Sequence, residues 1–363
     1  MMKINNRTIG TDGDVYIIAE MSANHGGDLA TARKIIHAAK EAGADAIKLQ
    51  TYTADTITID CDNEHFQIKQ GTIWDGQTLH RLYQNAYTPW EWHRPLKQLA
   101  GELEIDFFSS PFDNTAVDFL EQLDVPAYKI ASFEMNDTGL LKKVAATGRP
   151  VLFSTGMATL DEIALAVEAL EEAGASGNIA MLKCTSAYPA AAADMNLNTI
   201  SDMRTRFGIP IGLSDHSLGI EVPVAATALG ATIIEKHLTL DRNIETADSS
   251  FSLEPNEFAE MVAAVRRTSA AIGSVHYGTT TGDARNRDFR RSLFVVQPVE
   301  AGEPFTEENV RSIRPGYGLE PKYLDQVIGQ IASKTIERGT PLAWEHLESA
   351  ETATAKQKVT AVR

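Results

Sequence analysis

The sequence predicts a (β/α)₈ barrel, the TIM-barrel architecture, followed by a small second domain. Short β-type runs alternate with amphipathic helical stretches through about the first 275 of 363 residues, which predicts parallel strands joined by crossover helices. Eight such runs are present, the number at which a parallel sheet closes into a barrel. They cover residues 15–20, 46–50, 106–110, 127–132, 151–155, 179–184, 211–215 and 232–237.

The stretches between these runs have helical periodicity. In 29–43, Ile35, Ile36 and Ala39 share one face and Gly43 marks the end, and 160–174 repeats this design. An open doubly wound sheet is the rival architecture, but it favours a glycine-rich dinucleotide loop after the first strand. The NHGG sequence at 24–27 is not such a loop, so the closed barrel is preferred.

The remaining segments set the predicted boundaries. Residues 1–275 form the barrel, 276–291 a linker rich in Gly, Thr and Arg, 292–352 a small domain, and 353–363 a flexible tail. Within the barrel, the connection from about Thr53 to Pro89 is unusually long and contains Trp74. A long loop at the carboxyl ends of the barrel strands indicates a lid or a substrate-shaping element.

Charge and composition exclude some classes of function. The formal net charge of −16 argues against nonspecific binding to nucleic acid or anionic membrane, because the summed field repels phosphate. The two cysteines, Cys61 and Cys184, fit free thiols in a reducing compartment. The chain starts without an apolar signal core and has no run of 18 apolar residues, which predicts a soluble, cytoplasmic protein.

Polar side chains gather at the predicted strand ends, where barrel enzymes carry their chemistry. A solvated rim would explain one or two such ends, but here all eight are polar, so an active site is predicted. In the last strand, alternation puts Glu235 and His237 on one face and Lys236 on the other, so Lys236 is expected to be structural. The other ends carry Glu20 and Ser22, Lys48 and Gln50, Ser109 and Ser110, Lys129 and Ser132, Ser154 and Thr155, Lys183 and Thr185, and Ser214, Asp215 and His216.

Two histidines at adjacent strand ends, His216 and His237, predict a metal site. Two imidazoles with open positions for water and substrate suit a Lewis-acid divalent ion such as Mn²⁺, with Mg²⁺ or Co²⁺ as alternatives. A hydrogen-bonded rim residue remains the plainer explanation of either histidine alone. His25, in the first loop, fits a helix-entry residue as well as a substrate contact.

Lysines and serines at several strand ends predict a cradle for a small anion. Lysine supplies charge, and serine hydroxyls and loop N–H groups supply directional donors. Glu20 is a candidate to deprotonate a water, and Asp248 is either an acid–base group or a helix-entry cap. The cradle candidates are Lys48, Lys129, Lys183, Ser110, Ser132, Ser154 and Ser214.

Several segments together resemble the sialic acid synthase family, whose members condense phosphoenolpyruvate with an amino sugar. The similarity runs from about residue 15 to 345, and NVRSIRPGYGL at 309–319 resembles the antifreeze-like (SAF) domain of that family. The barrel segments that carry it are IIAEMSANHGG (17–27), AGADAIKLQTYTADTIT (42–58), FFSSPFD (107–113), YKIASFE (128–134), STGMA (154–158), GLSDHSLG (212–219) and EKH (235–237).

The resemblance implies roles for individual residues. His216 and His237 match the metal ligands, Glu20 the carboxylate that handles water, and Tyr188 and Asp248 positions that contact the sugar. The family is a homodimer with the small domain swapped onto the partner, and Arg314 matches an arginine that this domain lends to the partner's sugar site. Residues that match the phosphoenolpyruvate site are Lys48, Gln50, Ser110, Lys129, Ser132, Ser154 and Ser214.

Within the family, AEMSAN, KLQTYTADT and LKCTSAYPA (182–190) are most similar to the branch that makes pseudaminic acid. That resemblance implies 2,4-diacetamido-2,4,6-trideoxy-L-altrose as the sugar and an apolar surface near its methyl group. The alternatives are a legionaminic or N-acetylneuraminic acid synthase, a non-catalytic sugar-binding protein, and a phosphoenolpyruvate-dependent aldolase for a phosphorylated sugar. Residues compatible with the apolar surface, and equally with a place in the protein core, are Met21, Ala23, Ala187, Tyr52 and Trp74.

Overall fold

The computed structural model describes residues 2–10 and 15–348, and the chain divides into two compact units between Gly273 and Ser274. Each unit has its own cluster of buried hydrophobic side chains. The tail predicted at 353–363, and the last residues of the predicted small domain, lie outside the described residues. Within the described parts of the chain, no helix is long and apolar enough to cross a membrane.

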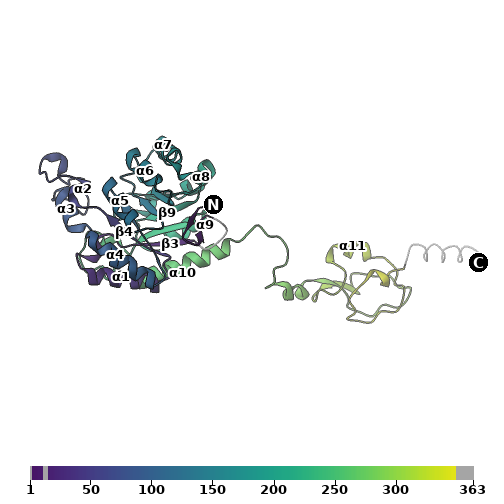
Figure 1. Cartoon of the computed structure of the whole chain (residues 1–363). Coiled ribbons are helices and arrows are strands. Elements are labelled where there is room, and N and C mark those ends of the chain that lie inside the picture. Colours follow the sequence, from purple (N-terminus) through teal and green to yellow (C-terminus); the bar gives the residue numbers. More distant parts are fainter. Residues whose placement is uncertain (1, 11–14, 349–363) are drawn as a thin grey trace, which may run out of the picture. The chain divides into compact units, whose positions relative to one another are not determined.

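The first unit is a closed barrel of eight parallel strands surrounded by helices (Figure 1). This confirms the predicted architecture. Neighbours around the barrel follow the order β10, β3, β4, β5, β6, β7, β8 and β9. The strands are β3 (Tyr16–Glu20), β4 (Ala46–Thr51), β5 (Asp106–Pro111), β6 (Tyr128–Ile130), β7 (Val151–Ser154), β8 (Ile179–Cys184), β9 (Ile211–Asp215) and β10 (Ile233–His237).

Helices outside the strands start and stop where side chains can satisfy free backbone groups. The carboxylate of Asp28 accepts hydrogen bonds from the N–H groups of Ala30 and Thr31 and so caps α1. Thr159 and Glu162 form a capping box at the start of α7. The outer helices are α1 (Leu29–Glu41), α4 (Trp90–Glu102), α5 (Asn114–Gln122), α6 (Thr138–Ala145), α7 (Leu160–Leu170), α8 (Asn198–Phe207), α9 (Glu221–Ala228) and α10 (Pro255–Ile272).

The seam between the first and last strands closes the barrel. β10 pairs with β3 over five residues in register, from Ile233 opposite Tyr16 to His237 opposite Glu20. The side chain of Asn24 crosses the same seam, because its Nδ2 donates to the carbonyl of Leu238 at 3.0 Å. At the amino-terminal side of the unit, β1 (Lys3–Ile4) and β2 (Arg7–Thr8) form a short antiparallel pair.

The long connection after β4 folds into short helices. It contains α2 (Ala54–Ile57), a 3₁₀ turn at Glu64–Phe66 and α3 (Leu79–Ala86), and α2 lies beside α3 (Figure 1). Thr53 caps α2 and Thr78 caps α3 through hydroxyl oxygens that accept backbone N–H bonds. This connection is therefore an ordered part of the barrel unit.

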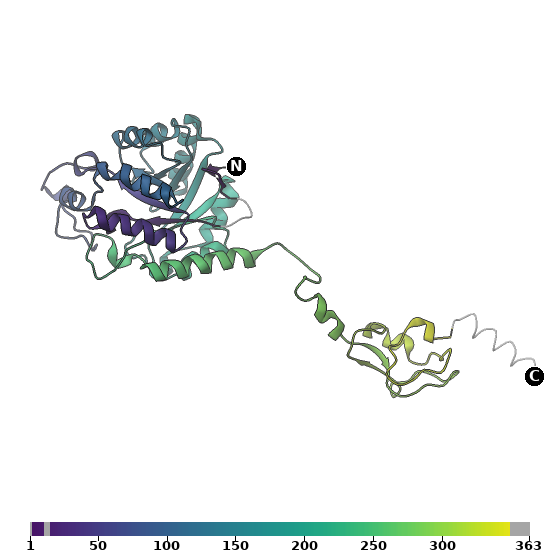
Figure 2. The ribbon, with the colours of Figure 1, turned by 60° about the horizontal axis from the view of Figure 1, so that its bottom comes forward.

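The second unit is built mostly of extended chain and turns (Figure 2). β11 (Ser292–Val295) pairs antiparallel with β12 (Val310–Ile313), and α11 (Leu324–Val327) is a single short helix. The segment predicted as a linker contains a 3₁₀ helix at Ala284–Phe289. The buried core of this unit consists of Leu293, Val295, Val299, Phe305, Val310, Val327, Ala332, Ile336 and Leu342.

Candidate active site

A cavity of about 490 Å³ opens at the carboxyl ends of the barrel strands. Each of the eight strands, or the residue that follows it, contributes lining side chains. Much of the remaining wall comes from the connection after β4, between Ile57 and Ala86. The cavity therefore has one wall made by strand ends and another made by a connection.

Two lysines and two glutamates form a buried ionic network in the floor of this cavity. Lys48 Nζ lies 2.7 Å from Glu20 Oε2 and 3.6 Å from Glu235 Oε2, and Lys129 Nζ lies 3.4 Å from Glu235 Oε1. Ser214 Oγ donates to Glu235 Oε1 at 3.0 Å. All four charged side chains are buried, so their charges are poorly screened by solvent.

Burial and neighbouring charges shift the pKa values in this network in different directions. Burial raises the pKa of Glu20, although Lys48 opposes it. Burial alone would raise the pKa of Glu235, but the charges of Lys129 and Lys48 together hold it below its usual value. Burial lowers the pKa of Lys129, with Glu235 opposing and Lys48 adding to the effect. Glu235 is thus the fixed anion, and Glu20 is the carboxylate that takes up a proton more readily.

A set of hydroxyl and amide groups lies next to the ionic network. Gly156 N donates to Ser132 Oγ at 3.0 Å, and a methyl group at Gly156 would collide with Ser132 Oγ and Ser186 Oγ. Ser154 Oγ is buried and has no hydrogen-bond partner among the described residues. Gln50 Nε2 donates to Glu20 Oε1 at 3.2 Å. These groups offer directional donors beside two buried lysines, which suits an anion with several oxygens.

Two predicted members of the anion cradle do not line the cavity. Ser110 stands behind it, where its hydroxyl oxygen accepts a 3.2 Å hydrogen bond from Lys48 Nζ. The prediction for Lys183 is wrong: its Nζ donates to Thr185 Oγ1 at 2.6 Å and to the carbonyl of Cys184. The physical reason is strand alternation, since Cys184 faces the cavity and its neighbour on β8 must face away.

The rings of the two predicted metal ligands are neighbours in the lining of the cavity. The ring centroids of His216 and His237 are 5.4 Å apart. His216 Nδ1 lies 3.2 Å from the carbonyl of Thr185, which fixes the ring and leaves Nε2 as the acceptor. Burial lowers the pKa of His237, with the neighbouring His216 adding to the effect, and this keeps the His237 imidazole neutral. Burial works in the same direction on His216, but the adjacent Cys184 raises the pKa of that ring above its usual value. A neutral, oriented imidazole, as at His237, is the form that binds a metal.

The donor set fits a divalent metal that is held by few protein ligands. His237 Nδ1 is buried and has no hydrogen-bond partner within the described part of the chain, so a ligand would satisfy it. No group of three or more His, Cys, Asp or Glu residues with metal-binding geometry occurs among the described residues. Water and substrate would therefore have to complete the coordination of an ion at this histidine pair.

Lys236 and Asp215 form a separate ion pair on the outer side of the barrel wall. Lys236 Nζ lies 2.5 Å from Asp215 Oδ2 and also donates to the carbonyl of Ser217. Both side chains are fully buried and neither lines the cavity. Lys236 therefore holds the loop after β9 in place, as its position on the strand indicated.

Aromatic and acidic groups surround the histidine pair. The ring of Tyr188 lies 4.4 Å from that of His216 and 5.3 Å from that of Trp74. Asp248 precedes a 3₁₀ helix without capping it, because its carboxylate accepts instead from Ala23 N at 3.3 Å and from the hydroxyl of Ser22. Burial raises the pKa of Asp248. Tyr188 and Asp248 both line the cavity, beside the histidines.

One acidic lining residue was missed from the sequence. Glu134 follows β6, and the Oε2 atom of its side chain is buried without a hydrogen-bond partner among the described residues. Burial raises the pKa of Glu134 to about 7, although Lys129 opposes it. The signal was its place at the end of the YKIASFE segment, two residues after Ser132. A carboxylic acid that holds its proton near neutral pH is a candidate proton donor.

The five residues expected to form an apolar surface have mixed outcomes. Ala23, Tyr52 and Trp74 line the cavity as expected. Met21 is fully buried in the hydrophobic core, which is the alternative left open for it, and Ala187 is exposed outside the cavity, so neither forms part of the apolar surface.

His25 also lies outside the cavity. Its Nε2 is 3.1 Å from Thr88 Oγ1, and its Nδ1 accepts from Gly27 N at 3.0 Å. Burial lowers its pKa to about 4. His25 is therefore a neutral, structural residue of the first loop.

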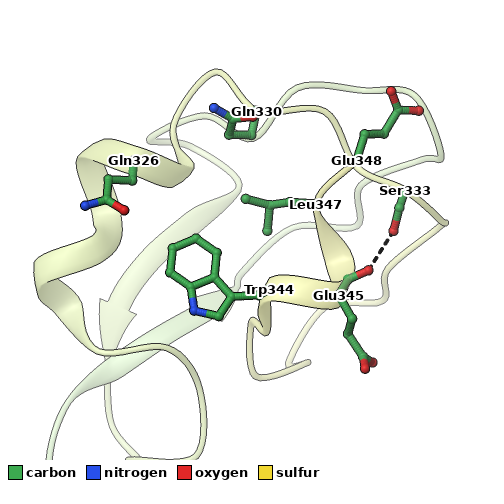
Figure 3. Close-up of a pocket in the computed structure, with 7 residues that line it drawn as sticks. All are labelled: Gln326, Gln330, Ser333, Trp344, Glu345, Leu347 and Glu348. Carbon is green, nitrogen blue, oxygen red and sulfur yellow. Dashed lines mark hydrogen bonds between the residues drawn. The ribbon is translucent and has the colours of Figure 1, made fainter. Parts of the chain in front are cut away.

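The second unit has a hollow of its own, which lacks the groups that an anionic substrate requires (Figure 3). Its lining contains carboxylates and amides and no lysine, arginine or histidine. Arg314 follows β12 elsewhere in this unit and is exposed. The residues that line the hollow are Gln326, Gln330, Ser333, Trp344, Glu345, Leu347 and Glu348.

Comparison with known proteins identifies the family of the chain. Residues 35–277 match the NeuB family, and residues 290–348 match the SAF domain. The chain belongs to the NeuB family. Among relatives of this NeuB-family protein, the pseudaminic acid synthase of Campylobacter jejuni is 47% identical over 94% of this chain and 98% of the relative. The pseudaminic acid synthase of Helicobacter pylori is 43% identical over 92% of this chain and 97% of the relative.

A solved structure supports the same assignment. The N-acetylneuraminic acid synthetase of Leptospira borgpetersenii, crystallised with citrate, is 33% identical, with a TM-score of 0.69. The match covers 78% of this NeuB-family chain and 94% of that chain. The resemblance seen in the sequence motifs and the expectation of a barrel followed by a SAF domain are both confirmed.

Proposed function

We propose that this NeuB-family chain is a pseudaminic acid synthase. It condenses phosphoenolpyruvate with 2,4-diacetamido-2,4,6-trideoxy-L-altrose and water to give pseudaminic acid and phosphate. The observation that carries the proposal is one cavity with a lysine–serine cradle beside a histidine pair, in a chain whose relatives at 43–47% identity are pseudaminic acid synthases. The chain is taken to act in the cytoplasm.

Phosphoenolpyruvate carries a carboxylate and a phosphate, and the strand-end wall offers donors for both. Lys48 and Lys129 supply charge, and the hydroxyl of Ser154, which lacks a protein partner among the described residues, is free to donate. Holding the two anionic groups apart orients the C3 atom of the enol toward the sugar. The other residues proposed to contact this ligand are Gln50, Ser132 and Ser214, whereas Ser110 supports Lys48 from behind the cavity.

His216 and His237 would hold the divalent ion, which we take to be Mn²⁺, with Mg²⁺ or Co²⁺ as substitutes. Bound there, the ion would act as a Lewis acid toward the aldehyde oxygen of the open-chain sugar. The buried, unpartnered Nδ1 of His237 and the ring of His216, fixed by Thr185, support this role.

Two carboxyl groups with raised pKa values supply the proton transfers. C3 of phosphoenolpyruvate forms the new bond to the aldehyde carbon, and Glu134 gives its proton to the aldehyde oxygen. Glu20 then accepts a proton from the water that adds to C2. In the resulting adduct the C2–O bond to the phosphate group breaks, and phosphate leaves with the bonding electrons. The C2 hydroxyl becomes the C2=O group of the product and passes its proton to the departing phosphate. Lys129, beside Glu235, stays close to the developing negative charge.

The sugar is bound by residues around the histidine pair. Tyr188 and Asp248 contact it from the barrel, with Asp248 held by Ser22 and Ala23. We further propose a homodimer in which the small domain is swapped, so that Arg314 of the partner subunit reaches the sugar.

The test is phosphate release from phosphoenolpyruvate with Mn²⁺ and one of three sugars: the trideoxy-diacetamido altrose, the legionaminic acid precursor, or N-acetylmannosamine. Release with the altrose sugar alone supports the proposal. Release with another sugar keeps the chemistry and rejects the specificity. Release with none of them favours a sugar-binding protein that has kept the barrel.

The direction of bond cleavage has its own test. With ¹⁸O in the bridging ester position of phosphoenolpyruvate, the label should leave with phosphate. Label retained in the sugar product would contradict cleavage of the C2–O bond.

A further inference from the structure

The short helix α3 turns an apolar stripe toward the cavity. Leu79, Leu82, Tyr83 and Ala86 follow the i, i+3, i+4, i+7 spacing of one helix face, and all four line the cavity. Each is only half-buried, whereas such a stripe normally lies against a protein core. The opposite face of α3, with Arg81, Gln84 and Asn85, is exposed. The apolar stripe thus has the cavity as its neighbour.

Several specific contacts hold this stripe at the cavity. The rings of Tyr83 and Tyr52 are 5.7 Å apart, and Tyr52 in turn lies 5.1 Å from Phe112 at the end of β5. His80, on α3, is 3.0 Å from Asp55 on α2. These contacts tie α3 to two barrel strands and to α2. The stripe is therefore a built wall of the cavity.

A second anchor joins the same connection to the far rim. Trp74 Nε1 donates to the carbonyl of Ala247 at 3.0 Å, next to Asp248. The ring of Trp74 also contacts Tyr188, which contacts His216. An unbroken series of side chains thus leads from the histidine pair to the wall made by the connection.

The strand-end wall and the α3 stripe differ in polarity, although other parts of the connection add His65, Gln67, Gln70 and Thr72 to the cavity lining. The strand-end wall carries Glu20, Lys48, Lys129 and Glu235, whereas the α3 stripe carries no ionisable group other than the phenol of Tyr83. A hydroxyl placed against such a wall loses its hydrogen bonds to water, while a methyl group gains from leaving water. The α3 side of the cavity therefore favours the methyl-bearing part of a ligand.

We propose that the α3 stripe, together with Trp74, is the specificity-determining surface that receives the 6-methyl end of the sugar. The inference rests on the proposed function and deepens it. An extended six-carbon chain spans about 6 Å with C–C bonds of about 1.5 Å. This is longer than the 4.4 Å between the rings of His216 and Tyr188, so a sugar whose aldehyde lies at the histidines can extend past Tyr188. The surface selects a 6-deoxy sugar over its 6-hydroxy counterpart.

The experiment replaces Leu82 by glutamine and measures kcat/KM for the trideoxy-diacetamido altrose and for its 6-hydroxy counterpart. Glutamine keeps helix propensity but puts an amide into the apolar wall. We expect kcat/KM for the deoxy sugar to fall about tenfold, mainly through KM, and for the hydroxy sugar to change less than about threefold. The KM for phosphoenolpyruvate should stay unchanged.

Controls separate this role from a structural one. Leu82→Met should keep the wild-type preference, and Gln84→Ala, on the exposed face of α3, should leave both sugars unaffected. Equal losses for both sugars in Leu82→Gln, or a raised KM for phosphoenolpyruvate, would overturn the inference and leave the proposed function intact. Failure of the wild-type protein to use the altrose sugar would overturn both.

Discussion

The strand-end wall and the α3 wall enclose one cavity but are held by different means. Lys48, Lys129 and Glu235 lie on strands whose positions are fixed by the hydrogen-bonded barrel and whose side chains pair with each other. The α3 wall has no fully buried residue and is tied to the rim by ring contacts and one indole hydrogen bond. The groups that we propose for the chemistry thus lie on the strand-end wall, and the surface that we propose for substrate choice lies on the wall that can change without disturbing the barrel.

The largest expected loss of activity comes from a substitution in the strand-end wall. Lys129→Met removes the cation 3.4 Å from Glu235 and leaves that buried carboxylate facing the phosphoenolpyruvate site. Phosphate release should fall about 10³-fold with either sugar, because the substrate's charge loses a buried partner. Lys142→Met, in an exposed ion pair with Glu172, is the matched control and should retain full activity. A Lys129→Met enzyme within tenfold of wild type would remove Lys129 from the catalytic centre.

A smaller effect, on the KM for phosphoenolpyruvate alone, is expected from a substitution in the loop after β7. In Gly156→Ala the new methyl group collides with Ser132 Oγ and Ser186 Oγ and displaces the hydroxyl cradle. The KM for phosphoenolpyruvate should rise about tenfold to a hundredfold, while that for the sugar stays within about threefold. Gly101→Ala, in α4 with open space around it, is the control. If the sugar KM rose as much, the cradle would not be dedicated to phosphoenolpyruvate.

A substitution of Arg314 tests whether the second unit contributes to sugar binding. Arg314→Ala should raise the KM of the sugar about tenfold and leave that of phosphoenolpyruvate nearly unchanged, because one hydrogen-bonded charge is lost at the sugar. Initial rates with each substrate varied in turn give both values. Arg311→Ala, three residues earlier on β12 and also exposed, serves as the control. Equal losses for both substrates would contradict the assigned role.

The smallest effect is on stability. Burial raises the pKa of Glu134 from its ordinary 4.5 to about 7, so between these values the folded protein keeps a proton that the unfolded chain has released. Stability from this group is therefore full below pH 4.5 and is lost as the pH rises to 7, by up to about 3 kcal/mol. The glutamine of Glu134→Gln does not titrate in this pH range. The thermal unfolding midpoint of the variant, relative to that of wild type, should therefore rise by several degrees between pH 5 and pH 8. A difference independent of pH would mean that Glu134 has an ordinary pKa.

Strand periodicity explains how much could be predicted from the sequence. Alternation placed Glu235 and His237 on one face and Lys236 on the other, because a closed barrel gives every strand one inner and one outer side. The same rule, applied at β8, would have excluded Lys183 in favour of Cys184. The strand predicted at 127–132 ends at Ile130, because Ala131 and Ser132 leave the sheet to line the cavity.

The sequence predicted that the long connection shapes the substrate site, but the place of the α3 stripe in that wall was not predicted, for a physical reason. The stripe on α3 has the spacing of any helix that packs on a core, and spacing alone does not tell whether protein or an open cavity lies opposite. Glu134 escaped for a similar reason, since its raised pKa arises from burial by segments distant in sequence.

The seam between β3 and β10 sets the order in which the chain can fold. Because the partner of Tyr16 is Ile233, a nascent chain must lengthen past β10 before the barrel can close. Until then β3 and β9 each present an open edge, which is a template for pairing with other chains. The second unit, with its own core, is synthesised only after closure has become possible. Truncation before residue 233 should therefore leave an aggregation-prone open sheet, whereas truncation after Gly273 keeps all eight strands.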